Sequence, residues 1–180
     1  MNFIFTQDQL DFQEAISSML RAEVTADSIR ARWKNESGVD SAFMRQAHDL
    51  GLNSMLIPES LGGLGLTPVD FILLAEACGE VALPEPLVES VMVTTPSLVD
   101  ILDQGLGNVD VQKVIDGVLA GEVRVALGHA INPCINYADS ADWFLLPDGD
   151  GVYLLPKEAV TLEVKTSVDP SRRLFAASFA

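Results

Sequence analysis

A glycine-rich segment, Gly62-Gly63-Leu64-Gly65, lies directly before residues typical of a helix start. Turns of this kind can bind phosphate, because backbone N–H groups at a helix N-terminus point at the anion. A phosphate loop also needs a preceding buried strand and either Gly-Lys-Ser/Thr or an intact Gly-x-Gly-x-x-Gly, and neither occurs here. The default interpretation is a tight turn with positive φ at Gly63, and a nucleotide cradle is the alternative.

Four carboxylates are available for general acid–base chemistry: Glu59, Glu76, Glu80 and Glu85. A catalytic base needs a positioned substrate and a shifted pKa. Each of the four falls in a predicted helix or turn, where a solvated side chain is the simpler interpretation. No catalytic residue is therefore assigned.

The two cysteines, Cys78 and Cys134, lie among apolar or small residues without a second pair or a nearby histidine. This spacing favours free reduced thiols over a disulfide or a zinc site. We therefore expect no metal site.

Composition limits the function classes. The chain has 180 residues, 48% of them hydrophobic, and a formal net charge of −15. Such a charge repels nucleic acid and anionic membranes, and no basic patch offsets it. The N-terminus lacks the pattern of a signal peptide, and no apolar stretch approaches membrane-spanning length. We expect a cytoplasmic protein that binds neither nucleic acid nor membrane.

Helical patterns occupy the first two thirds of the sequence. Thr6 and Gln9 have the spacing of a capping box, and an apolar stripe follows them at Phe12, Ile16, Met19 and Leu20. Polar residues from 30 to 40 predict a break before the next helix.

Phe43, Ala47 and Leu50 share one helical face, and Gly51 is placed to end that helix in the left-handed conformation. After the glycine-rich turn, Thr67 is a predicted N-cap, with Pro68 and Asp70 in the first helical turn.

The segment from 87 to 102 is apolar but contains Pro96, which predicts a kink or a restart with Thr94 or Thr95 as cap. One more amphipathic helix, from 111 to 119, ends at Gly121.

From about Val123 the pattern changes to short apolar runs bounded by Gly, Pro, Asn and Asp, which is typical of strands. Residues 148–151, Asp-Gly-Asp-Gly, predict a hairpin turn. We therefore predict an α+β protein, with an all-α helical domain over 1–121 and a small antiparallel β domain over 122–180.

The motifs Leu50-Gly51-Leu52, Pro58-Glu59 and Gly62-Gly63-Leu64-Gly65 resemble the N-terminal domain of the acyl-CoA dehydrogenase family. The order of a helical domain and then a β domain is similar to that family over nearly the whole chain. In the family, flavin adenine dinucleotide (FAD) binds between the β domain and a C-terminal helical bundle. A carboxylate removes the α-proton of an acyl-CoA thioester, and the β-hydride passes to the flavin.

Two departures from the family pattern limit what the resemblance implies. The bundle that normally supplies the catalytic glutamate is absent from these 180 residues. Gly128 and His129 stand where the family has a strand-end Thr-Glu motif, and the following flavin-contacting loop looks deleted. The resemblance makes Gly128 and His129 candidate flavin contacts, and a plain polar loop is the alternative.

Shortened sequences of this kind resemble divergent subunits of heteromeric acyl-CoA dehydrogenases, including steroid-degrading ones. The resemblance implies an acyl-CoA substrate, FAD shared with a partner chain, and association with a homologous subunit or with itself. It places Leu87, Val91, Met92 and Thr95 at the acyl pocket, with ordinary core packing as the alternative. A non-catalytic interaction module and a truncated dehydrogenase are the competing hypotheses.

Overall fold

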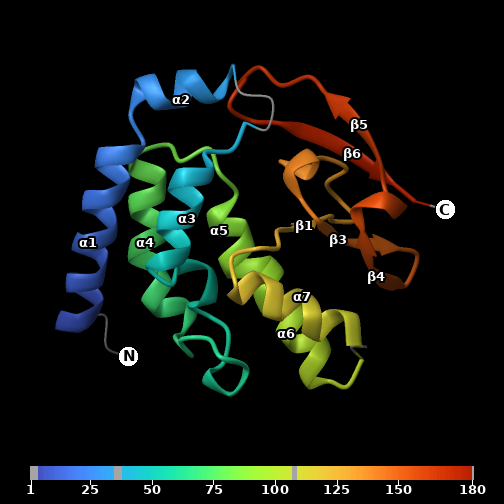
Figure 1. Ribbon diagram of the computed structural model, residues 1–180, viewed down its shortest axis with the longest axis horizontal. Coiled ribbons are helices and arrows are strands. Elements are labelled where there is room, and N and C mark those ends of the chain that lie inside the picture. Colours follow the sequence, from blue (N-terminus) through green and yellow to red (C-terminus); the bar gives the residue numbers. More distant parts are fainter. Residues whose placement is uncertain (1–3, 35–37, 107–108, 180) are drawn as a thin grey trace.

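The protein is described by a computed structural model that covers residues 4–34, 38–106 and 109–179. Helices form one side of the molecule and two small sheets form the other, with α5, α6 and α7 lying between the first four helices and the strands (Figure 1). The predicted α+β class, helical first and β second, is confirmed.

Seven α-helices lie in the described part of the chain: α1 (Gln7–Glu23), α2 (Ala26–Arg32), α3 (Ser41–Asp49), α4 (Pro68–Glu80), α5 (Leu87–Glu89), α6 (Thr95–Asp103) and α7 (Val109–Leu119). Short 3-10 turns, η1 (Leu52–Ser54) and η2 (Glu59–Leu61), connect α3 to the glycine-rich turn. Among the described residues, no helix combines the length and the apolar character needed to cross a membrane.

The helix starts predicted at Thr6 and Thr67 are confirmed. The Thr6 hydroxyl accepts a hydrogen bond from the Gln9 backbone N–H, and the Gln9 side chain accepts one from the Thr6 backbone N–H. At α4, Asp70 accepts hydrogen bonds from both the backbone N–H and the hydroxyl of Thr67. Local sequence therefore determines where these two helices begin.

Helix α2 was not predicted. The polar stretch from 30 to 40 was interpreted as a break, but its first residues complete a seven-residue helix that begins at the N-cap Thr25. Arg32, at the end of α2, is only 4% exposed. The break before α3 therefore begins at Trp33 and not at Arg30, because the helix capped by Thr25 continues to Arg32.

The glycine-rich turn has positive φ at Gly62 and Gly65, as well as at the preceding helix end, Gly51. Gly63 does not have positive φ, so that expectation was wrong. A Cβ at Gly63 would lie 2.1 Å from the carbonyl oxygen of Ile57. Glycine is required at this position because two backbone segments approach closely, not because of its φ angle.

Pro96 is accommodated without a helix break. A π-helical segment, η3 (Ser90–Thr94), joins α5 directly to α6, and Thr94 and Thr95 both have right-handed helical backbone angles. The Thr94 hydroxyl donates to the carbonyl of Glu89 instead of capping α6. The predicted cap was therefore wrong, because the wide π turn accommodates the proline in a continuous helix.

The strands are β1 (Val125–Leu127), β2 (Ile135–Asn136), β3 (Trp143–Asp148), β4 (Gly151–Pro156), β5 (Thr161–Lys165) and β6 (Leu174–Ser178). They form two three-stranded sheets, in the orders β1-β3-β4 and β2-β6-β5. The hairpin predicted at residues 148–151 pairs Asp148 with Gly151. Most pairs are antiparallel, but β1 pairs with β3 in parallel.

Three apolar clusters hold these elements together. One lies among α1, α3, α4 and α5, and another lies between the two sheets around Phe144. The remaining cluster joins Leu98 of α6 and Ile115 of α7 to Leu145 of β3. Helices and strands thus share a core across the boundary predicted near Gly121, and that boundary stays a prediction.

Candidate functional site: an apolar groove over a buried ion pair

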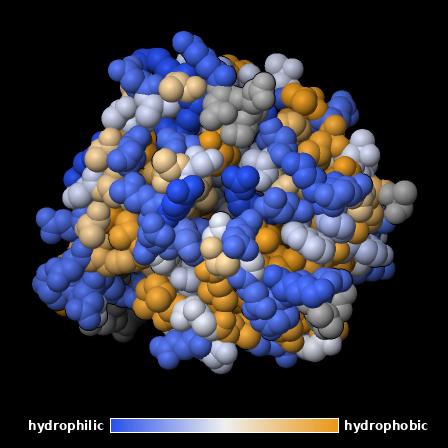
Figure 2. Space-filling view, viewed as in Figure 1, coloured by the Kyte–Doolittle hydropathy of each residue, from blue (hydrophilic) through white to orange (hydrophobic). Residues whose placement is uncertain are grey.

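On the face shown in Figure 2, hydrophobic and hydrophilic side chains are interspersed and do not separate into one patch. Because no single apolar patch marks a site on this face, the hollows of the surface are the candidate sites. A groove of about 790 Å³ lies between α2, the end of α4, α5 with η3, and two β-region segments at 136–137 and 169–172. Its apolar lining includes Ile29, Trp33, Leu83, Val88, Met92 and Val93.

The structure places the four residues predicted to line an acyl pocket in different environments. Met92 lines the groove. Leu87 and Val91 are buried in the helical core, and Thr95 is buried beside a small hollow that β1 also lines. Only Met92 is therefore positioned to contact a molecule in the groove.

Beside the groove, a buried ion pair joins the end of α2 to the segment before α5, and Glu85 of this pair lines the groove. Arg32 Nε donates to Glu85 Oε1 at 2.6 Å, and each residue is only 4% exposed. A buried charge of this kind is tolerated only with a close partner. Glu85 was predicted to be solvated, and that prediction was wrong because Arg32, 53 residues earlier, reaches it.

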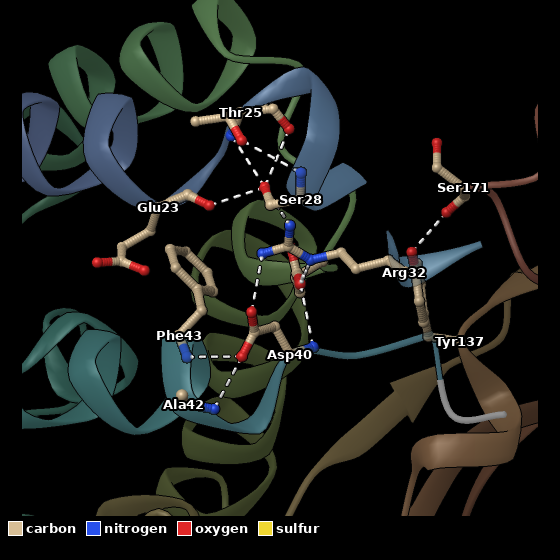
Figure 3. Close-up of polar contacts among 10 residues, drawn as sticks. Glu23, Thr25, Ser28, Arg32, Asp40, Ala42, Phe43, Tyr137 and Ser171 are labelled. Atoms are coloured by element: carbon tan, nitrogen blue, oxygen red, sulfur yellow. Dashed lines mark hydrogen bonds and ion pairs between the residues drawn. The ribbon is translucent and has the colours of Figure 1, made fainter. Parts of the chain in front are cut away.

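The Arg32 guanidinium has further partners around it (Figure 3). Its Nη1 donates to the Ser28 hydroxyl at 2.9 Å, and its Nη2 lies 3.6 Å from Asp40 Oδ2. Asp40 also caps α3, because Oδ1 accepts hydrogen bonds from two backbone N–H groups of that helix. The ion pair thus joins α2, the start of α3 and the segment before α5.

Tyr137 brings the β region to the same groove. Its backbone is left-handed, with φ of 53°, and its hydroxyl donates to the carbonyl of Ser171 (Figure 3). Burial, followed by the nearby negative charge of Glu85, raises the pKa of Tyr137 to about 12. The phenol therefore stays neutral at physiological pH and acts as a hydrogen-bond donor.

The other three candidate carboxylates are exposed. Glu59 and Glu76 lie on the surface, and Glu80 forms a 3.6 Å surface ion pair with Arg21. None of these three lines the groove.

The cysteines are free thiols, as predicted. Cys78 lines the groove, and burial raises the pKa of its thiol to about 11, so it is a poor nucleophile at neutral pH. In the described part of the chain, no group of three or more metal-ligating side chains converges.

The candidate flavin contacts lie away from the groove. The Gly128 backbone N–H donates to the Leu145 carbonyl, and His129 Nδ1 accepts a hydrogen bond from the Ile131 N–H. A Cβ at Gly128 would meet the Leu146 side chain at 2.7 Å, so packing alone explains this glycine. These two hydrogen bonds are both internal to the strand end. The assignment of Gly128 and His129 stays a prediction.

Sequence reasoning missed two residues that line the groove and the partner of one of them: Tyr137 was not considered, Glu85 was placed in solvent, and its partner Arg32 was not considered. A Pro-Glu-Pro sequence at 84–86 was the available signal, because it fixes the backbone on both sides of one carboxylate.

Known proteins resemble this chain along most of its length. The family model "Acyl-CoA dehydrogenase, N-terminal domain" matches residues 6–106. Acyl-CoA dehydrogenase FadE27 of Mycobacterium tuberculosis (strain ATCC 25618 / H37Rv) is 27% identical over 193 residues, covering 93% of this chain and 52% of that protein.

Solved structures share the fold. A variant of the Tcur3481-Tcur3483 steroid ACAD matches with a TM-score of 0.78 at 18% identity, covering 97% of this chain and 55% of that one. The ChsE4-ChsE5 complex from Mycobacterium tuberculosis matches with a TM-score of 0.76 at 21% identity, covering 100% and 57%. The chain thus spans just over half the length of these relatives.

Proposed function

Because the chain belongs to the acyl-CoA dehydrogenase family, we propose that it forms part of a flavin-dependent assembly that introduces a double bond between the α and β carbons of an acyl-CoA thioester. The observation that carries this proposal is the apolar groove beside α5 and η3, on the helix where the sequence predicted the acyl pocket. Its volume lies within the range of small-molecule sites, about 300–1,000 Å³. In this proposal, Met92 contacts the acyl group, and the ion pair beside the groove holds Glu85 in the groove wall.

The catalytic base is proposed to come from outside the described residues. Glu59, Glu76 and Glu80 are exposed and away from the groove, and Glu85 is engaged by Arg32. A proton-abstracting carboxylate must be free to reach the α carbon of a bound thioester. Two carboxylates that do line the groove, Glu89 and Asp169, already accept hydrogen bonds from Asn136 and Ser171. In this proposal the base therefore comes from a further domain or a partner chain.

Flavin is likewise proposed to be held largely by groups beyond the described residues. At Gly128 and His129, the Gly128 N–H already donates to the Leu145 carbonyl and His129 Nδ1 already accepts from the Ile131 N–H, so in this proposal the two residues form one side of the flavin site and not the whole of it. FAD in the assembly is thus shared with a partner, as the family resemblance implies.

We propose a homologous acyl-CoA dehydrogenase subunit as that partner. Large apolar side chains are exposed on the β region, among them Ile131 at 87% and Val164 at 74%. Such side chains would be buried by a partner, although apolar side chains exposed singly are also normal on protein surfaces. The solved neighbours include complexes of two different chains, the Tcur3481-Tcur3483 and ChsE4-ChsE5 proteins, which supports a heteromeric arrangement. Steroid side-chain thioesters are the first acyl-CoA substrates to test, since one neighbour is a steroid ACAD.

The same exposed side chains also favour a second candidate function, a non-catalytic interaction module built on this fold. Co-expression with the adjacent reading frames, followed by a visible absorption spectrum of the purified complex, separates the two. The dehydrogenase proposal predicts a flavin band in the complex that bleaches when an acyl-CoA substrate is added without oxygen, and a colourless chain when it is purified alone.

A stable complex without flavin would favour the interaction module. Stoichiometric flavin on the lone chain would contradict the shared site.

A further inference from the structure

Strand β4 forms an open edge of the sheet ordered β1-β3-β4 and lies at the periphery of the molecule, on the side opposite α1 (Figure 1). Among the described residues, no backbone hydrogen bond reaches its outer side. β4 is six residues long, and none of its side chains is charged. Val152 is 59% exposed and Tyr153 is 46% exposed. An uncharged edge strand of this length is a template for pairing with another strand.

The other sheet edges of the described structure are better protected than β4. β1 and β2 are only three and two residues long. β5 carries Glu163 and Lys165, which form a 2.6 Å ion pair on one face of the strand. Short strands and charged side chains are features that keep sheet edges from pairing. β4 has neither feature.

The hairpin determines which backbone groups of β4 point outward. Asp148 pairs with Gly151 across a two-residue turn, so this pair and every second pair along the ladder exchange hydrogen bonds. Val152, Leu154 and Pro156 lie at the pairs in between, so their backbone groups point away from β3. Val152 and Leu154 each present an N–H and a C=O at the edge, whereas Pro156 presents a C=O alone.

We infer that β4 pairs with β4 of a second copy of this chain in an antiparallel dimer with two-fold symmetry. The two three-stranded sheets then become one continuous sheet across the dimer. Opposite side chains of an antiparallel pair lie on the same face, so the two-fold axis must lie level with a residue of β4 and not between two residues. The inference does not depend on the proposed function.

The outward groups select the position of this axis. An axis at Tyr153 sets Val152 opposite Leu154 of the copy, so all the outward N–H and C=O groups of these two residues find partners. An axis at Leu154 would set Val152 against Pro156, which has no N–H to donate. An axis at Val152 would set Leu154 against Asp150, which lies in the hairpin turn. The axis at Tyr153 therefore satisfies the edge best, and it also places exposed Val152 beside an apolar side chain.

Charges at the ends of the joined strands are complementary in this register. Asp150 of one copy approaches the end of the other copy's β4, where Lys157 follows, and both side chains are exposed. Lys157 donates one hydrogen bond to the Asp139 carbonyl and keeps donors for a second partner. Glu158 lies one position further out. Exposed pairs of this kind specify register more than affinity. Since the chain carries a net charge of −15, an uncharged strand is a surface at which two copies can meet.

The same substitution at two sheet edges tests the dimer. Val152→Lys puts a charge on the β4 edge, and Val164→Lys, at a valine of β5 that is 74% exposed, is the matched control. A one-strand interface is small, so sedimentation equilibrium of the full chain is run at about 10–500 µM. Salt at about 0.5 M screens the repulsion between copies. We expect a wild-type dimer that persists in Val164→Lys, while Val152→Lys raises the dissociation constant at least about tenfold.

A disulfide at the axis tests the register. Residues at a pair that exchanges no hydrogen bonds have Cα atoms about 4.5 Å apart, which a disulfide can span. Val152 lies about 7–8 Å from Val152 of the copy, because the two are offset diagonally. In a Cys134→Ser background, in which Cys78 is buried, Tyr153→Cys should therefore cross-link at least about tenfold faster than Val152→Cys under mild oxidation.

A wild-type chain that stays monomeric at about 500 µM would overturn the inference. A dimer that survives in folded Val152→Lys, or that dissociates in folded Val164→Lys, would also overturn it, as would equal cross-linking rates for the two cysteine variants. A monomer that binds a homologous subunit only with Val152 intact would assign the edge to that subunit and contradict the homodimer. None of these outcomes bears on acyl-CoA oxidation, so the proposed function is tested separately.

Discussion

Two Pro-Glu pairs in this chain lead to opposite environments. Pro58-Glu59 opens the glycine-rich turn, where the Glu59 side chain is exposed. Pro84-Glu85 precedes α5, where Glu85 is 4% exposed and paired with Arg32. The two environments differ because, of these two carboxylates, Glu85 is the one that pairs with a guanidinium from a helix distant in the sequence. A motif that looks chemical can thus be structural, while a carboxylate with no distinctive local motif can be buried in an ion pair beside a groove.

Removing the guanidinium of Arg32 should have the largest effect. Arg32→Met leaves the Glu85 charge buried without its main partner and should lower the free energy of unfolding by about 3–5 kcal/mol. The double variant Arg32→Met/Glu85→Leu removes both charges and should recover most of this loss. Urea unfolding of the chain, the two single variants and the double variant measures the coupling. Additive losses in the double variant would show that the pair is not the connection described here.

Substitution of Gly63 in the glycine-rich turn should lower the stability of the protein through a steric clash. Gly63→Ala places a methyl group against the Ile57 carbonyl and should cost about 1–3 kcal/mol of stability through forced backbone movement. Gly79→Ala is the matched control, because nothing lies within 4 Å of its added Cβ and α4 should gain about 0.5–1 kcal/mol. Thermal unfolding compares the two. A neutral Gly63→Ala would refute the close approach of the two backbone segments.

Asp70, at the start of α4, should make a smaller contribution to the stability of the protein, and this contribution should depend on pH. Hydrogen bonds from the Thr67 side chain, then from Gln9, hold the pKa of Asp70 below its ordinary value of 3.8. A lowered folded-state pKa stabilises the protein above pH 3.8, and this contribution is lost as pH falls through the folded pKa. The stability difference between wild type and Asp70→Asn should therefore shrink below pH 3.8.

An NMR titration checks the cause of this pH effect. Thr67→Val removes the hydroxyl donor and should raise the pKa of Asp70. An unchanged Asp70 titration in that variant would contradict the assigned hydrogen bond.

The smallest effect is expected at the other Pro-Glu pair. Glu59→Gln removes a solvated charge and should change the free energy of unfolding by less than about 0.5 kcal/mol. It should also leave the turnover of any assembled enzyme nearly unchanged. Chemical denaturation and an acyl-CoA oxidation assay of the complex measure both. Large loss of turnover in a folded Glu59→Gln complex would make this turn a chemical site after all.

Features set by neighbours in the sequence could be predicted. The capping pairs at Thr6 and Thr67 and the hairpin at 148–151 each depend on residues within a few positions. The buried stripe of α1 followed from helical periodicity. The α+β order and the family resemblance followed from such local signals taken together.

Features set by distant contacts could not be predicted. Arg32 and Glu85 are 53 residues apart, and neither has a local pattern that indicates burial. The parallel pairing of β1 with β3 and the steric role of Gly63 likewise depend on how separate segments meet. Of the predicted acyl-pocket residues, only Met92 reaches the groove, because the π-helical turn at η3 was not foreseen.

Filling the groove tests the central claim that it receives the acyl group. Met92→Trp adds bulk at the groove wall and leaves the ion pair in place. The complex assembled with this variant should keep its flavin band and its melting temperature, while bleaching by an acyl-CoA substrate slows at least about tenfold, a barrier increase of about 1.4 kcal/mol. Unchanged bleaching in a folded, flavin-loaded Met92→Trp complex would show that the acyl group binds elsewhere.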